Sequence, residues 1–167
     1  EDFNQKEVAQ HWQKKLNVER QSQWGKFLEL DKKLMKTSQI WANTMAKRYK
    51  NWVNKSTLHE RQSGDWFYNY SKIIERFKSY WVKAPIKNGV TLSEGVWYHT
   101  IQCPDKKSCT DTMKKAIQKT WKMYMNENSY NGIHYRAMTN QNFTKLWVWT
   151  AVNNWRYFIV LHYATNT

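Results

Sequence analysis

Few residues of this chain have the types and spacing that common forms of catalysis need. The five glycines form neither a GxGxxG fingerprint nor a Walker-type phosphate loop. The sequence has no HExxH metalloprotease motif and no GxSxG nucleophile elbow, and its two cysteines are too few for a cysteine-rich zinc site. These absences exclude nucleotide binding through those loops, and we predict that the protein is not an enzyme.

The histidines are the remaining groups suited to acid–base chemistry at neutral pH. His59 lies in the charged stretch His-Glu-Arg-Gln, where we expect it to be exposed to solvent. His99, His134 and His162 lie among aromatic residues, where hydrogen-bonded packing is a commoner role than catalysis. No Ser-His or Cys-His nucleophile pair can be argued from the spacing.

The two cysteines are candidates for a disulfide. Cys103 and Cys109 are separated by five residues in CPDKKSC, where Pro104 and Asp105 favour a turn. A turn of that length can bring the two Cα atoms within the few ångströms that a disulfide needs. The alternative is a pair of free thiols in a reducing compartment, and we favour the disulfide.

Features of the chain outside the cysteines also favour secretion. The sequence begins Glu1-Asp2 without Met, as a mature protein does after removal of a signal peptide, although a recombinant product would begin in the same way. Three Asn-x-Ser/Thr sequons are candidate glycosylation sites, at Asn54, Asn69 and Asn142. No apolar run approaches the roughly 18 residues of a membrane-spanning helix. We expect a secreted protein.

The elements that must position these groups are helices first and strands later. Residues 30–53 predict a helix that begins after Asp31 as N-cap, and further helices are predicted around 8–16, 73–81 and 111–124. The helix predicted over residues 30–53 has apolar or small residues at helical spacing: Leu34, Ser38, Trp41, Ala42, Met45, Tyr49 and Trp52.

The C-terminal third has the composition of strands. Residues 145–150 and 156–164 are rich in β-branched and aromatic side chains, Asn153-Asn154 between them is compatible with a hairpin turn, and 95–101 predicts a further strand. Both faces of the last strand are apolar, so layers must cover it on both sides. The order of elements predicts an α+β fold in which helices sandwich a sheet.

Several segments resemble motifs of the CAP superfamily, which includes cysteine-rich secretory proteins, insect venom antigen 5 and plant pathogenesis-related proteins. FLELDKKLMKTSQIWANTMA at 27–46 is similar to the family's signature helix. KKAIQKTWKMYMNENSYN, NFTKLWVW and YFIVLHYATN resemble later motifs, in the family's order. The matching positions of the signature helix are Asp31, Leu34, Gln39, Trp41, Ala42 and Ala46.

The resemblance implies a single CAP-like domain over 1–167. The expected fold is the family's α-β-α sandwich, with helices flanking a central, mostly antiparallel sheet. Residues 60–92 have no clear counterpart in the family and are expected to form an insertion.

The resemblance also implies a central cleft, in which family members commonly place two His and two Glu around a divalent cation. The equivalent positions here are His59, Glu94, Tyr124 and Asn142, so a Tyr and an Asn replace one Glu and one His. A phenol with a reference pKa near 10 stays neutral, and an amide is a weaker ligand than an imidazole. We predict no metal and no cofactor, and a hydrolase that uses His59 with Glu94 is the least favoured function.

Charge and tryptophan content suggest what the protein binds. The 27 basic and 13 acidic residues give a net charge of +14, which favours anionic membranes or glycosaminoglycans as partners. Nucleic acid is not favoured, because most tryptophans fall on the predicted core stripes rather than beside the lysines. The tryptophans outside these stripes are candidates for an apolar ligand site or for the insertion's own core: Trp66, Trp81, Trp97 and Trp155, with Phe67 and Tyr68 nearby.

Two functions of different classes remain. The first is a secreted, non-enzymatic CAP-like protein that binds a small apolar ligand, a sterol or a fatty acid, or a partner surface. The alternative is a basic adhesive or effector module that binds anionic membranes or glycosaminoglycans through its lysines.

Overall fold

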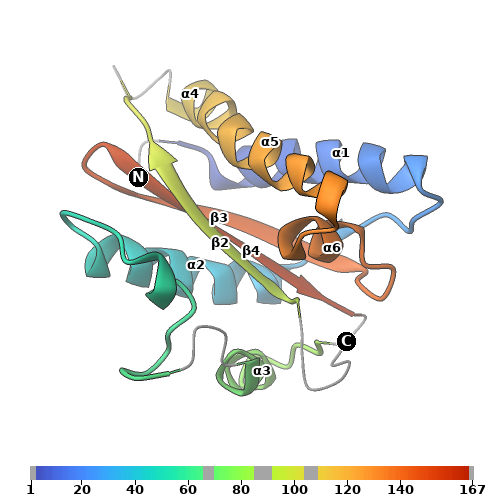
Figure 1. Cartoon of the computed structure of the whole chain (residues 1–167), viewed down its shortest axis with the longest axis horizontal. Helices are drawn as coiled ribbons and strands as arrows, with labels where there is room; N and C mark the ends of the chain where they lie inside the picture. The colour runs from blue at the N-terminus through green and yellow to red at the C-terminus, as the bar shows by residue number, and fades with distance from the viewer. Residues whose placement is uncertain (1–2, 66–69, 85–91, 104–108, 166–167) are drawn as a thin grey trace.

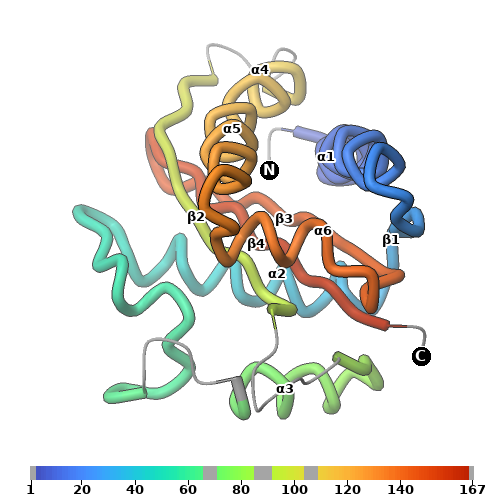
Figure 2. Tube along the Cα trace, turned by 45° about the vertical axis from the view of Figure 1, so that its right-hand side comes forward, coloured from blue at the N-terminus to red at the C-terminus, as the bar shows by residue number. Residues whose placement is uncertain are grey.

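A computed structural model describes residues 3–65, 70–84, 92–103 and 109–165. A four-stranded sheet with strand order β1-β3-β4-β2 forms the middle layer (Figure 1). Helices α1, α4, α5 and α6 cover one face of the sheet, and α2 and α3 lie on the other, as Figure 2 also shows. This is the α-β-α sandwich that the sequence predicts. The bounds are β1 Glu29–Leu30, β2 Glu94–Thr100, β3 Lys145–Asn153, β4 Arg156–Ala164, α1 Gln5–Ser22, α2 Lys32–Arg48, α3 Tyr70–Lys78, α4 Cys109–Ala116, α5 Gln118–Asn126 and α6 Ile133–Thr139, with short 3-10 turns at Lys55–Thr57 and Glu127–Tyr130.

The two long helices begin at side-chain caps that the sequence supplies. Asp31 accepts hydrogen bonds from the backbone N–H groups of Lys33 at 2.8 Å and Leu34 at 3.1 Å, which are otherwise without helical partners. Asn4 caps α1 in the same way, through the N–H of Glu7. The predicted stripe of α2 is buried from Leu34 to Met45 against β3 and β4, which fixes that helix on the sheet.

Strand β4 is the centre of the molecule. It pairs antiparallel with both β3 and β2, and its residues from Tyr157 to Ala164 are all buried, as expected for a strand covered on both faces. β1 adds a short parallel edge beside β3. The hairpin between β3 and β4 turns at Asn154, whose φ of 56° lies in the left-handed region that Asn tolerates.

The structure corrects three details of the sequence prediction. Helix α2 ends at Arg48, so Trp52 does not continue the core stripe and is instead 71% exposed. The helix expected over 111–124 is two helices that meet near Ile117. The sequence patterns predict neither β1 nor α6. The expected insertion contains α3, whose Ile73 and Phe77 are fully buried, while 66–69 and 85–91 lie outside the described residues.

Candidate functional site

The start of β2 lies at the centre of a buried polar network. The antiparallel register places Glu94 opposite His162, and His162 Nε2 is 2.7 Å from Glu94 Oε2. On the other side, His59 Nδ1 is 2.8 Å from Glu94 Oε1. The guanidinium of Arg61 donates to both carboxylate oxygens, through Nη1 at 2.8 Å and through Nη2. The carboxylate of Glu94 therefore accepts four charged or polar N–H donors while its side chain has no exposed surface.

The protonation states of this network follow from its partners. Burial alone would raise the pKa of Glu94, but the charge of Arg61 and the hydrogen bonds from Arg61, His162 and His59 outweigh it and hold that pKa well below its ordinary value. Burial lowers the pKa of His162, although the bond to Glu94 opposes the shift. A neutral His162 that donates Nε2–H to Glu94 leaves Nδ1 to accept from Thr37 Oγ1, 2.8 Å away on α2.

Arg61 also joins the network to the helix layer. Its guanidinium lies over the ring of Trp41 at 3.5 Å from the centroid, a close cation–π contact. Trp41 is held in turn by a hydrogen bond from Nε1 to the carbonyl of Leu58, at 2.9 Å. The network thus ties the loop that contains His59 and Arg61 to α2 and to the sheet.

A second His–carboxylate pair lies on the opposite side of β2. His134 Nδ1 is 2.7 Å from Glu127 Oε2, and the backbone N–H of His134 donates to Glu127 Oε1 at 2.9 Å. The His134 ring stacks on Tyr124 with centroids 4.2 Å apart. Gly132 leaves the space that Glu127 occupies, because a Cβ there would lie 2.4 Å from Glu127 Oε1. Burial lowers the pKa of His134 in spite of its bond to Glu127.

The start of β2 lies between the two pairs, and Glu94 of one pair and His134 of the other line the same small cavity there. Successive residues of a strand point to opposite faces of the sheet. The Glu94 side chain therefore lies on the face covered by α2, where it contacts His162 and His162 contacts Thr37. Gly95 lies on the other face, beside Tyr124 of α5. The cavity lined by Glu94, Gly95, Tyr124 and His134 measures about 10 Å³, which is room for about one water molecule.

These residues do not fit the divalent cation that the CAP fold implies. Among the described residues, no group of three or more His, Cys, Asp or Glu side chains is arranged to hold a metal ion. Both oxygens of Glu94 face the guanidinium of Arg61, whose charge repels a cation at that position. In this network an arginine and two histidines, rather than a cation, hold the buried carboxylate in place.

The structure brings together three of the four positions expected in the cleft. His59 and Glu94 are bonded, and Tyr124 lies against Gly95 next to Glu94. Asn142 does not join them, since it is exposed in the turn before β3. The expectation that His59 is exposed is wrong, because the side chain is only 3% exposed beneath Arg61 and Glu94. The sequence patterns indicate neither the pairing of Glu127 with His134 nor that of His162 with Glu94.

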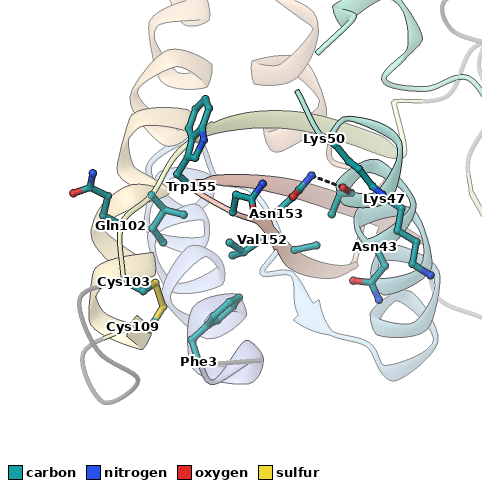
Figure 3. A pocket seen from close by; sticks show the side chains of 14 residues that line it. Phe3, Asn43, Lys47, Lys50, Gln102, Cys103, Cys109, Val152, Asn153 and Trp155 are labelled. Atoms are coloured by element: carbon teal, nitrogen blue, oxygen red, sulfur yellow. Dashed lines mark hydrogen bonds between the residues drawn. A yellow bond between two sulfur atoms is a disulfide. The ribbon is translucent and has the colours of Figure 1, made fainter. Parts of the chain in front are cut away.

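A pocket lies at the other end of the sheet, beside the β3–β4 hairpin (Figure 3). It has a volume of about 920 Å³ and an apolar floor from Ile101, Ala151 and Val152. Phe3 and Trp155 form two of its sides, and the Cys103–Cys109 disulfide forms another. The predicted disulfide is thus confirmed, with Cα atoms 5.0 Å apart.

Polar groups lie on the α2 side of this pocket. Lys47 and Lys50 extend from the end of α2 and from the residues after it, and neither forms an ion pair with a carboxylate that the structure describes. Asn153 donates to the carbonyls of Ala46 at 2.8 Å and Tyr49 at 3.1 Å, which fixes the hairpin against α2. None of the 14 described residues that line the pocket is acidic.

Of the tryptophans expected at a ligand site, only Trp155 lines this pocket in the part of the chain that the structure describes. Trp81 is 82% exposed, and Trp97 packs against Tyr98 with centroids 5.5 Å apart. Trp66, with Phe67 and Tyr68, lies outside the described residues, as does the sequon at Asn69. Asn54 is half-buried and caps the turn Lys55–Thr57 by accepting from Ser56.

The sequence matches no protein-family model and no curated protein sequence. The fold, in contrast, is similar to those of several solved structures, including the following two. The CAP domain of enterococcal PrgA superposes with a TM-score of 0.63 at 13% identity, over 97% of this chain and 62% of that one. An outer surface protein from Borrelia burgdorferi superposes with a TM-score of 0.58, also at 13% identity, over 98% of this chain and 97% of that one. This chain thus spans about 62% of the length of the PrgA chain that it matches. The sandwich, its strand order and these likenesses together show that the chain has a divergent CAP-like fold.

Proposed function

We propose that the protein is an extracellular binding protein without enzymatic activity, and that it holds a small anionic amphiphile, such as a fatty acid, in the pocket beside the β3–β4 hairpin. The observation that carries this proposal is the combination of an apolar floor with two lysines and, among the described residues that line the pocket, no acidic side chain. The volume of the pocket, about 920 Å³, lies within the range of small-molecule sites, about 300–1,000 Å³.

The apolar floor favours a hydrocarbon chain. Ala151 and Ile101 are almost fully buried, while Val152 remains 38% exposed and Trp155 50% exposed. Covering these two partly exposed side chains with an acyl chain removes apolar surface from water, at about 25 cal/mol per Å². The free energy of that burial drives association without any new polar contact.

The lysines favour a negatively charged headgroup over a neutral one. Lys47 and Lys50 are three residues apart at the end of α2, and Figure 3 shows both on the same side of the pocket. The net charge of +14 adds a positive potential over the molecule. A fatty acid satisfies both features, whereas a neutral sterol satisfies only the apolar one.

The proposal that the protein is not an enzyme rests on what surrounds each candidate group. The described lining of the pocket contains no His, Asp, Glu or Ser side chain that could act as a base or nucleophile. The network around Glu94 contains such groups, but they are bonded to one another and buried. A reacting group needs access to its substrate, and the burial of His59, Glu94 and His162 supports a role in stability rather than in catalysis.

Two observations support an extracellular location. The Cys103–Cys109 disulfide is typical of oxidising compartments. One protein of similar fold is an outer surface protein. Among the described residues, no helix combines the length and the apolar character that a membrane span requires.

Calorimetric titration with sodium laurate, below its micellar concentration, tests the proposal. Val152→Glu places a carboxylate over the floor at a partly exposed position, and we expect it to weaken binding by at least about tenfold. The double variant Lys47→Gln, Lys50→Gln should weaken laurate binding about fivefold, since exposed ion pairs contribute about 0.2–1 kcal/mol each.

Lys119→Gln with Lys122→Gln is the matched control. It removes the same charge from two exposed positions three residues apart on a helix, away from the pocket. We expect it to leave laurate affinity unchanged. Absence of laurate binding, or an equal loss from the two lysine pairs, would contradict the proposal. Preference for an uncharged sterol over laurate would show that the headgroup assignment is wrong.

A further inference from the structure

Two tryptophans occupy backbone positions that normally belong to glycine. Trp24 follows α1 and Trp81 follows α3, and each has a φ of 59°, in the left-handed region. The N–H of Trp24 bonds to the carbonyl of Gln21 at 3.1 Å, and that of Gly25 to Arg20 at 2.7 Å. This is the Schellman ending of a helix, in which the left-handed position usually holds Gly because a Cβ is unfavourable there.

Packing does not explain the choice of tryptophan at position 24. Its side chain is 98% exposed, so the indole contributes almost no buried surface to the fold. A large apolar ring in an unfavourable backbone conformation and in full contact with water is a cost to stability. Such a feature points to an interaction outside the folded chain.

Trp24 belongs to a wider apolar surface. Phe27 is 58% exposed and Val18 on α1 is 66% exposed. Two shallow hollows lie over this surface, one beside Trp24 and one beside Val18, and both are lined by Phe27 and Gln21. The hollows are therefore continuous. We call the surface formed by Lys14, Val18, Trp24, Lys26 and Phe27 the Trp24 patch.

The charges of the Trp24 patch are all positive. Lys26 lines the hollow beside Trp24, and Lys14 lines the hollow beside Val18. Neither ammonium forms an ion pair within the described parts of the chain, and no acidic residue lines either hollow. The neighbouring acid on α1, Glu19, accepts hydrogen bonds from Gln23 and from Tyr135 of α6 instead.

We propose that the Trp24 patch docks on the surface of an anionic lipid bilayer. Trp24 and Phe27 enter the boundary between headgroups and acyl chains, where an amphipathic indole is favoured, and Lys14 and Lys26 face the anionic headgroups. The hollows are shallow, and the Trp24 ring projects from the surface rather than filling a concave site. Insertion into a soft, anionic interface matches that shape and charge better than a rigid protein groove.

This site is separate from the pocket proposed above. Phe3, at the edge of the pocket, precedes the start of α1, whereas the Trp24 patch extends from Lys14, midway along the same helix, to Phe27 beyond its end, and the pocket shares no lining residue with either hollow. The 18 residues of α1 span about 27 Å. Membrane docking therefore does not depend on the pocket's ligand, and either proposal can fail without the other.

Vesicle co-sedimentation tests the docking. We expect binding to phosphatidylcholine vesicles in which one third of the lipid is phosphatidylglycerol, and much weaker binding to phosphatidylcholine alone, with loss of binding at high salt. Trp24→Gly should weaken partitioning about tenfold, since it removes most of the apolar side chain that inserts. Lys26→Gln should weaken it about fivefold on the anionic vesicles only.

Trp81→Gly is the matched control for Trp24→Gly. It relieves the same φ of 59° at the same helix-end position, on a tryptophan that is 82% exposed but follows a helix on the other face of the sheet. Both variants should keep the fold and gain thermal stability, and only Trp24→Gly should lose membrane binding. Equal losses from both variants, or no binding of the unmodified protein to anionic vesicles, would overturn the proposal. A Trp24-dependent dimer in solution without vesicle binding would show that the patch contacts a second copy instead.

Discussion

Replacing Glu94 with glutamine removes the carboxylate to which four N–H donors of the buried network point. His59, His162 and both terminal nitrogens of Arg61 donate to it. The variant keeps the shape of the side chain, so the change tests charge rather than packing. It leaves the guanidinium of Arg61 without its counter-charge, at a position where the Arg61 side chain is only 11% exposed.

The expected loss of stability follows from that burial. Breaking a buried ion pair by removing one partner costs about 3–5 kcal/mol, because the remaining charge is buried without compensation. Arg61 retains its contact with Trp41 and some access to water, which favours the lower end, about 3 kcal/mol. For a chain of 167 residues this corresponds to a fall in Tm of about 6–12 °C.

The stabilisation by Glu94 should depend on pH in a defined direction. The pKa of Glu94 in the folded protein lies well below the ordinary value of 4.5. The carboxylate therefore stabilises the fold above that ordinary value, and this contribution is lost as the pH falls through the lower, folded-state pKa. The difference between the unmodified protein and Glu94→Gln should be constant near neutral pH and should shrink only below about pH 4.5.

Thermal unfolding followed by circular dichroism measures both effects. Glu75→Gln is the control, because Glu75 is exposed on α3 and a surface change of this kind is usually worth no more than about 0.5 kcal/mol. A fall in Tm no larger than that of Glu75→Gln would refute the assignment of a stabilising buried charge. So would a difference that stays constant to the lowest pH at which both proteins are folded.

Four further outcomes are expected from the same structure. Burial lowers the pKa of His162 below its ordinary value of 6.5, so the unfolded chain takes up the proton first. The free energy of unfolding therefore falls as the pH drops below 6.5, and His162→Gln should reduce this dependence on pH in denaturant titrations. Replacing Cys103 and Cys109 with serine should cost about 2 kcal/mol, as expected for so short a loop, and an unchanged unfolding midpoint would contradict this. Asp31→Ala removes the cap of α2 and should cost about 1 kcal/mol in the same measurement, whereas a loss below about 0.3 kcal/mol would show that the cap is dispensable. Micromolar zinc should leave Tm unchanged, and a saturable rise that disappears in His59→Ala would show that the cleft binds metal.

The helices and strands that the sequence predicts well are those whose burial repeats at a regular period. The stripe from Leu34 to Met45 and the doubly apolar strand β4 are both observed, because one face or both faces of each element pack against the sheet. Asp31 marks the start of α2 correctly, since a cap is a local feature. The end of α2 is less local, because apolar spacing continues to Trp52 although the helix ends at Arg48.

The site is harder to predict, because its residues meet only through tertiary structure. His162 and Thr37 lie in segments that look like ordinary core, and nothing in their spacing indicates a bond between them. Glu127 accepts from His134 through a turn made possible by Gly132, a contact that depends on backbone geometry rather than on helical periodicity. The sequence Glu-Asn-Ser-Tyr-Asn-Gly-Ile-His places a turn-forming Asn-Gly before the histidine, but a turn alone does not predict its bond to Glu127.

NMR chemical-shift mapping with sodium laurate locates the surface at which we propose that the protein binds an anionic amphiphile. We expect saturable shifts confined to the pocket, at the methyl groups of Ala46, Ile101 and Ala151 and at the indole N–H of Trp155, which all line it. Shifts that centre on Trp24, or that spread evenly over the surface without saturation, would contradict the claim that this pocket binds the anionic amphiphile.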